Sequence, residues 1–185
     1  DSWYEHEGFI TANADHVRRA LAVLPAELRD QARLIFTAHS IPTAMAATSR
    51  YREQLEASAR HVSARLGRQD WALVYQSRSG RPRDPWLEPD ICDYLREART
   101  DGLRAAVICP IGFVADHVEV LYDLDHEALG LSRELGMTVA RAATVNDHPA
   151  FLELMTDLVL RTCQRYHRYP PLPITAQKVS GTFLV

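Results

Sequence analysis

Four short apolar runs, separated by longer amphipathic segments, most constrain what this sequence can fold into. Each run has the length of a β-strand and is bounded by polar residues, proline or glycine. Runs of this kind, alternating with helical segments, favour strands whose two faces are both covered. The runs are RLIFTAH (33–39), WALVYQ (71–76), RAAVICP (104–110) and, more weakly, MTVARAA (137–143).

The segments between these runs have the apolar spacing of amphipathic helices. In the first of them, Phe9, Val17, Leu21 and Leu24 share one stripe. The alternation predicts an α/β fold with a mostly parallel sheet of about four strands and helices on both faces. We expect one domain over residues 1–168 and an irregular tail over 169–185. The expected helical segments are 9–23, 48–66, 88–99, 114–135 and 148–166.

Composition narrows the class of partner. A chain of 185 residues with 46% hydrophobic residues can bury one core, and a net charge of -3 offers no basic surface for nucleic acid. The three cysteines form no closely spaced pair, which favours a reducing, cytoplasmic setting. No apolar run approaches the roughly 20 residues of a membrane-spanning helix, and the first residues do not resemble a signal peptide. Peripheral contact with a membrane is left open.

Polar and ionisable side chains collect directly after three of the expected strands. His39 and Ser40 end the first strand, Gln76 and Ser77 follow the second, and CPIGFVADHVE (109–119) follows the third. In open α/β sheets the binding crevice lies outside the carboxyl ends of the strands. These groups are therefore expected to face one small-molecule site.

A line of acids follows the third strand. In a helix, Glu119, Asp123 and Glu127 would lie at i, i+4 and i+8, with about 6 Å between neighbours along the axis. Like charges at this spacing repel, so the line destabilises the helix unless a cation lies over it. Oxygen ligands with an occasional imidazole, here His117 nearby, suit a loosely held divalent metal. A merely solvated acidic face is the alternative that spacing alone leaves open.

Several of these motifs occur together, in the same order, in ferrochelatases, which insert ferrous iron into a porphyrin. The sequence resembles the carboxyl-terminal half of bacterial members of that family, from WYEHEGFITANADHV to FLELMTDLV. The resemblance implies a Rossmann-like chelatase lobe, the second of two similar lobes with the porphyrin between them. The motifs that carry it are FTAHSIP, LVYQSRSG, PWLEPDI, CPIGFVADHVEVLYDLD and NDHPAF.

The resemblance also implies roles for individual residues. His39 and Glu119 would be the catalytic pair, facing each other across the macrocycle and meeting the metal, while Asp123 and Glu127 would extend the metal path. Whether His39 accepts the pyrrole protons or first binds iron is left open, as is whether Glu119 shuttles protons or delivers metal. Trp86 could equally belong to the core. The expected substrate-binding residues are Ser40, Ile41, Tyr75, Gln76, Ser77, Trp86 and His117.

The implied partners are a porphyrin, a divalent metal and a first lobe or complementary subunit that this sequence does not contain. Ferrous iron is a substrate, and no tightly bound cofactor is expected. We expect no iron-sulfur cluster, because the last residues, YHRYPPLPITAQKVSGTFLV, contain no cysteine. Coproporphyrin III and protoporphyrin IX both remain candidate substrates. The alternatives are a cobalt or nickel chelatase acting on a sirohydrochlorin-like ring, a non-catalytic metal- or haem-binding lobe, and an inactive fragment.

Overall fold

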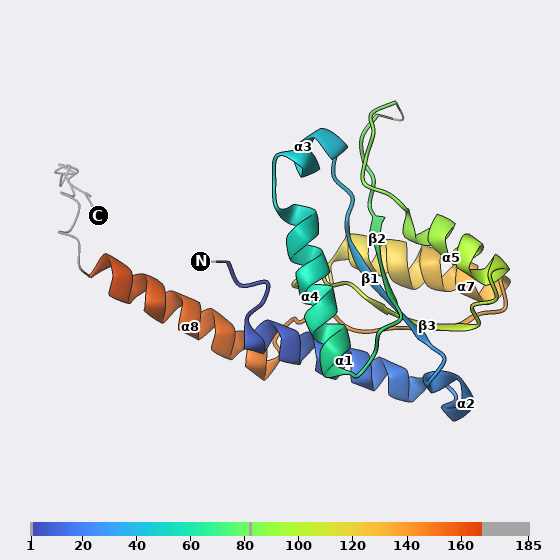
Figure 1. The fold of residues 1–185 in the computed structure, drawn as a ribbon, viewed down its shortest axis with the longest axis horizontal. Coiled ribbons are helices and arrows are strands. Elements are labelled where there is room, and N and C mark those ends of the chain that lie inside the picture. Colours follow the sequence, from blue (N-terminus) through green and yellow to red (C-terminus); the bar gives the residue numbers. More distant parts are fainter. Residues whose placement is uncertain (1, 82, 168–185) are drawn as a thin grey trace, which may run out of the picture.

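An all-parallel sheet forms the centre of the molecule in a computed structural model that describes residues 2–81 and 83–167 (Figure 1). Its four strands lie in the order β2-β1-β3-β4, so β1 and β3 are central. The α/β fold with a parallel sheet is as predicted from the sequence, and β1 and β2 have the predicted bounds. The strands are β1 (Arg33–His39), β2 (Trp71–Gln76), β3 (Ala105–Cys109) and β4 (Thr138–Arg141).

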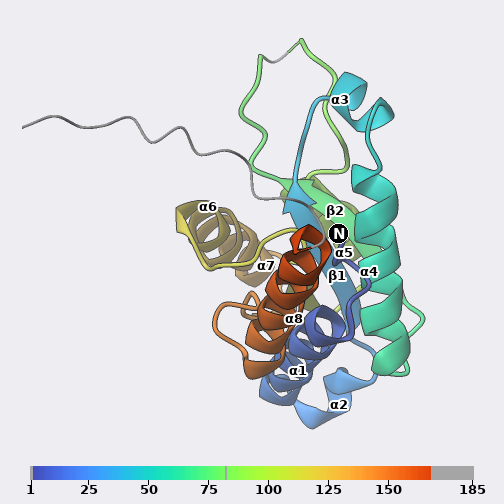
Figure 2. The same cartoon turned by 90° about the vertical axis from the view of Figure 1, so that its left-hand side faces the viewer.

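Helices cover both faces of the sheet, because alternate side chains of each central strand enter different cores. Leu34 and Phe36 of β1 pack with residues of α1, α4 and α8, whereas Ile35 packs with residues of α5 and η1. Figure 2 shows α1, α4 and α8 grouped apart from α6 and α7. The helices are α1 (Glu7–Val23), α2 (Ala26–Arg29), α3 (Thr43–Ala47), α4 (Tyr51–Arg65), α5 (Ile91–Thr100), α6 (Val118–Val120), η1 (Leu121–Ala128), α7 (Leu129–Glu134) and α8 (Pro149–Tyr166).

The segment 114–135 differs most from expectation. It is not one α-helix: a loop runs to His117, a short α6 begins at Val118, η1 is a π-helix, and α7 is again α-helical. A π-helix bonds i to i+5 and occurs frequently at functional sites. The simple i, i+4 geometry used for the acidic line therefore does not apply. The short helices α2 and α3 were also not anticipated, since neither buries a residue that would create an apolar pattern.

The last helix begins at a histidine cap. His148 Nδ1 accepts a hydrogen bond from the Ala150 N–H at 3.2 Å, and Pro149 occupies the first helical position. α8 contacts α1 near its beginning and then extends away from the sheet (Figure 1). The expected tail, 169–185, lies outside the described residues. Within the described ranges, no helix has both the length and the apolar character needed to cross a membrane.

Candidate active site

His39 and Glu119 meet at the carboxyl edge of the sheet. His39 ends β1, Glu119 lies in α6 after β3, and the His39 Nε2 to Glu119 Oε2 distance is 4.0 Å. The Ser40 carbonyl lies 2.5 Å from His39 Nδ1, so Nδ1–H donates to it. The Tyr51 hydroxyl donates to the His39 carbonyl at 3.0 Å. With Nδ1 engaged in this way, Nε2 is the ring nitrogen that is turned toward Glu119 and can accept a proton.

Glu119 is placed by a cap at the start of its helix. His117 is the N-cap residue, and its Nδ1 accepts a hydrogen bond from the Glu119 N–H at 3.3 Å. The His117 ring packs edge-on against buried Phe113, with 5.2 Å between ring centroids. His117, expected to contact substrate, thus orients the turn that carries Glu119.

Asp123 points toward the end of β2. Its carboxylate accepts hydrogen bonds from the Ser77 hydroxyl and, at 3.5 Å, from Gln76 Nε2. Ser77 has a φ of 61°, a left-handed backbone conformation that turns the chain there. Asp123 and Glu127 line a cavity of about 190 Å³ together with Asp90 at the start of α5. The acid line thus runs from His39 into a small polar cavity between β2, α5 and η1.

No compact metal cluster appears within the described ranges: no group of three or more His, Cys, Asp or Glu side chains there could hold a metal ion. His39 and Glu119 form one pair, whereas Asp123 and Glu127 lie further along the π-helix. A metal path through His39, Glu119, Asp123 and Glu127 stays a prediction. Along such a path the metal ion would bind these side chains one after another.

The loops after β1 and β2 are hydrogen-bonded to each other. Ser40 Oγ donates to the Leu87 carbonyl at 2.8 Å, and the Leu87 N–H donates to the Ile41 carbonyl at 2.9 Å. Trp86 packs against Gly80 so closely that a Cβ there would come within 2.1 Å of the indole. Ser40, Ile41 and Trp86 therefore hold the loops after β1 and β2 in place beside the site, in addition to any contact they make with substrate.

Tyr75 and Gln76 are almost completely buried. Tyr75 lines a cavity of about 270 Å³ with Ser40, and burial raises the pKa of its phenol. Among the described residues, neither the Tyr75 hydroxyl nor Gln76 Oε1 has a hydrogen-bond partner. Both expected substrate residues thus lie beneath the site, where only a group entering a cavity could reach them.

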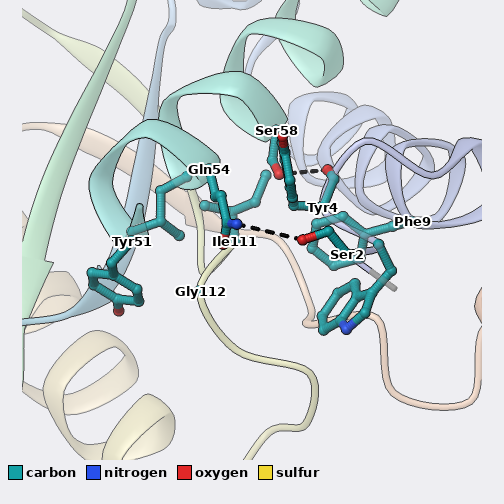
Figure 3. A pocket seen from close by; sticks show the side chains of 10 residues that line it. Ser2, Tyr4, Phe9, Tyr51, Gln54, Ser58, Ile111 and Gly112 are labelled. Atoms are coloured by element: carbon teal, nitrogen blue, oxygen red, sulfur yellow. Dashed lines mark hydrogen bonds between the residues drawn. The ribbon is translucent and has the colours of Figure 1, made fainter. Parts of the chain in front are cut away.

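An aromatic cavity beside β1 was not anticipated from the sequence. It has a volume of about 510 Å³ and is walled by Trp3, Tyr4, Phe9 and Tyr51 (Figure 3). Tyr51 joins it to the site through its hydrogen bond to His39. The closely spaced aromatic residues Trp3, Tyr4 and Phe9 were the one feature of the sequence that could have indicated this cavity. The other lining residues are Ser2, Gln54, Leu55, Ser58, Ile111 and Gly112.

Asp116, in the turn before His117, is bound by groups from β4 and the loop after it. Its carboxylate accepts from Arg141 at 2.9 Å, from Asn146 Nδ2 at 3.0 Å and from the Thr144 N–H at 3.4 Å. Burial alone would raise the pKa of Asp116, but the Asn146 hydrogen bond, the charge of Arg141 and the Thr144 bonds together hold it below the ordinary 3.8.

We predict that Asp116→Asn removes a contribution to stability that depends on pH. Because the pKa of Asp116 is lowered on folding, this contribution is fully present above pH 3.8 and is lost as pH falls through the folded value. Denaturant unfolding of both proteins from neutral to acidic pH should give a difference in free energy that is constant above about pH 5 and shrinks below about pH 4. A difference that does not change with pH would contradict the prediction.

Comparison with known proteins places this site in a family. Residues 1–163 match the family model described as Ferrochelatase. The chain is 47% identical over 174 residues to the coproporphyrin III ferrochelatase of Mycolicibacterium smegmatis, covering 91% of this chain and 50% of that protein. It is 46% identical over 170 residues to the ferrochelatase of Rhodopirellula baltica, covering 91% of this chain and 48% of that protein. The chain thus spans about half the length of these curated relatives.

A solved structure shares the fold. A cobalamin (vitamin B12) biosynthesis CbiX protein from Marinobacter aquaeolei VT8 matches with a TM-score of 0.51 and 20% identity, covering 72% of this chain and 98% of that chain. At this identity the likeness concerns the fold alone. It agrees with the Rossmann-like lobe expected from the sequence.

Proposed function

The chain belongs to the ferrochelatase family, and on that premise we propose that it carries the metal-inserting half of an enzyme that places ferrous iron into a porphyrin during haem biosynthesis. The observation that carries the proposal is the His39 and Glu119 pair, 4.0 Å apart at the carboxyl edge of the sheet. We propose coproporphyrin III as the porphyrin, because the Mycolicibacterium, Nocardia and Streptomyces relatives bear that name. The cytoplasm is the proposed location.

Metal insertion requires two pyrrole N–H protons to leave as the metal enters. His39 can accept a proton at Nε2, because its Nδ1–H is held by the Ser40 carbonyl. An imidazole nitrogen in this position can take a proton and then release it as a general base does. Glu119, facing Nε2, would stabilise the imidazolium that forms and carry the proton onward. The overall reaction consumes a free-base porphyrin and ferrous iron, and it releases the metallated porphyrin and two protons.

The acids of the π-helix supply a route for the metal. Asp123, held by Ser77 and Gln76, follows Glu119 in the sequence and lines the same cavity as Glu127. Oxygen ligands bind ferrous iron loosely enough to release it. We propose that iron passes along these carboxylates toward His39 and Glu119.

A second lobe would complete the cleft. Leu152, Met155, Val159, Leu160 and Tyr166 of α8 are all exposed, Val159 to 60%, and several share one side of the helix. A contiguous exposed apolar stripe is typical of a protein interface. We propose that the remaining half, which the relatives have, packs against this part of α8.

The function is tested by anaerobic metallation. The assay mixes this chain with the half of the Mycolicibacterium smegmatis relative that the chain does not match. In this mixture we expect ferrous iron to quench the fluorescence of coproporphyrin III faster than that of protoporphyrin IX. The chain alone should be slower, because it lacks the opposite wall. Haem binding without insertion would instead indicate a non-catalytic lobe. Cobalt insertion into sirohydrochlorin alone would indicate the other chelatase class.

A further inference from the structure

Arg141 connects two acids on either side of the proposed catalytic carboxylate. The arginine ends β4 and is largely buried, with 13% of its side chain exposed. Its Nε and Nη2 donate to the two carboxylate oxygens of Asp125, at 2.5 and 3.0 Å. Its Nη1 donates to Asp116 at 2.9 Å. One guanidinium therefore joins the π-helix to the loop that precedes α6.

Asn146 strengthens the loop side of this connection. Its backbone has a φ of 41°, and its N–H donates to the Val114 carbonyl at 3.0 Å. Its side-chain amide donates to Asp116 and its side-chain oxygen accepts from the Asp116 N–H, each at 3.0 Å. Asp116 is thus held at its backbone and at its side chain, and it cannot shift without breaking several bonds.

Glu119 and Asp123 lie between the two anchored positions, Asp116 and Asp125. The capping residue His117 directly follows Asp116. Arg141 contacts Asp116 and Asp125, and within residues 2–81 and 83–167 it forms no ion pair with Glu119 or Asp123. Its charge is therefore used to fix the ends of the segment, and it does not neutralise the carboxylates that would meet metal and protons.

We propose that Arg141 is a positioning residue for metal insertion, acting through Asp116 and Asp125 to hold Glu119 opposite His39. The inference rests on the proposed function. A planar guanidinium can bind Asp125 through two bonds and Asp116 through a third, which a lysine cannot reproduce. Small displacements of a catalytic group from its reacting partner lower the rate much more than they lower substrate affinity.

Kinetic comparison of Arg141→Met, Arg141→Lys and Arg33→Met tests the proposal. Arg33 is the matched control: it makes an ion pair with Asp70 and a hydrogen bond to Tyr94, but at the amino end of β1. We expect Arg141→Met to lower kcat between about ten- and a hundredfold with the porphyrin KM unchanged, and Arg141→Lys to recover part of the loss. Arg33→Met should keep the wild-type kcat. An unchanged kcat in Arg141→Met, or a loss found entirely in KM, would overturn the proposal.

Hydrogen exchange separates this proposal from the proposed function, since it needs no turnover. Amides of residues 116–128 should exchange faster in Arg141→Met than in wild type or Arg33→Met, while those of β1 and β3 keep their protection. If the wild type inserts no metal, the proposed function fails, and this exchange pattern alone decides whether Arg141 holds the segment. Unchanged exchange over 116–128 overturns the positioning role. If Arg141→Met does not fold, the same comparison is made with Arg141→Lys.

Discussion

Replacing His39 by alanine is expected to lower kcat for iron insertion by about 10²- to 10⁴-fold, the range typical for loss of a general base. The substitution removes the Nε2 that faces Glu119 at 4.0 Å, and among the described residues no other histidine forms an ion pair with Glu119. Porphyrin fluorescence under anaerobic conditions measures the rate. The porphyrin KM should change little, because the buried residues that line the site remain.

His61→Ala is the matched control. His61 also pairs with a glutamate, Glu5 at 3.5 Å, but on α4 away from the carboxyl edge of the sheet. It should retain wild-type kcat.

Glu119→Gln should also lower kcat. In the double variant of His39 and Glu119, kcat should fall by less than the product of the two single losses, because the two side chains act as a unit. Wild-type turnover by His39→Ala would refute the assignment.

Gly112→Ala is expected to lower the free energy of unfolding by about 1–3 kcal/mol, the usual cost of overpacking a core. A Cβ at Gly112 would come within 2.5 Å of the Ala38 Cβ and 2.8 Å of the Ala38 Cα. The loop cannot retreat easily, because the Gly112 N–H donates to the Thr37 carbonyl at 3.0 Å. Urea unfolding monitored by circular dichroism gives the change.

Gly130→Ala provides the comparison. Gly130 lies in α7, and a Cβ there would meet only the Arg133 side chain, at 3.9 Å. Alanine should leave stability equal or raise it by up to about 1 kcal/mol through its better helix propensity. Equal stability of Gly112→Ala and wild type would show that the loop after β3 can move away from β1.

Much of the fold could be predicted because its signals are local. The bounds of β1 and β2 agree with the apolar runs, since strands buried on both faces must be apolar throughout. The position of His39 at a strand end also followed, because parallel strands place their carboxyl ends at one edge. The family resemblance implied that Glu119 and His39 face each other across the macrocycle, whereas in the structure the two side chains lie 4.0 Å apart, which leaves no room for a ring between them.

Other parts of the site depend on contacts between distant residues. The helix 114–135 was predicted as regular, yet a π-helix occupies 121–128, and the local apolar spacing gives no indication of it. Arg141 belongs to no motif in the sequence. Its role depends on hydrogen bonds to Asp125 and Asp116, which lie 16 and 25 residues away in the sequence. The aromatic cavity likewise joins the start of the chain to α4 and the loop after β3.

The sequence by itself determined the four strands, their alternation with longer helical segments, and the family. It also determined which ionisable side chains follow the strand ends. These depend on hydrophobic pattern and on motif, both of which can be read along the chain. Only the tertiary structure decided that His39 Nδ1 is held by Ser40, that Asp123 is held by Ser77, and that Arg141 joins Asp116 to Asp125. Hydrogen bonds of this kind require a specific distance and direction between two groups, which packing of the whole domain sets.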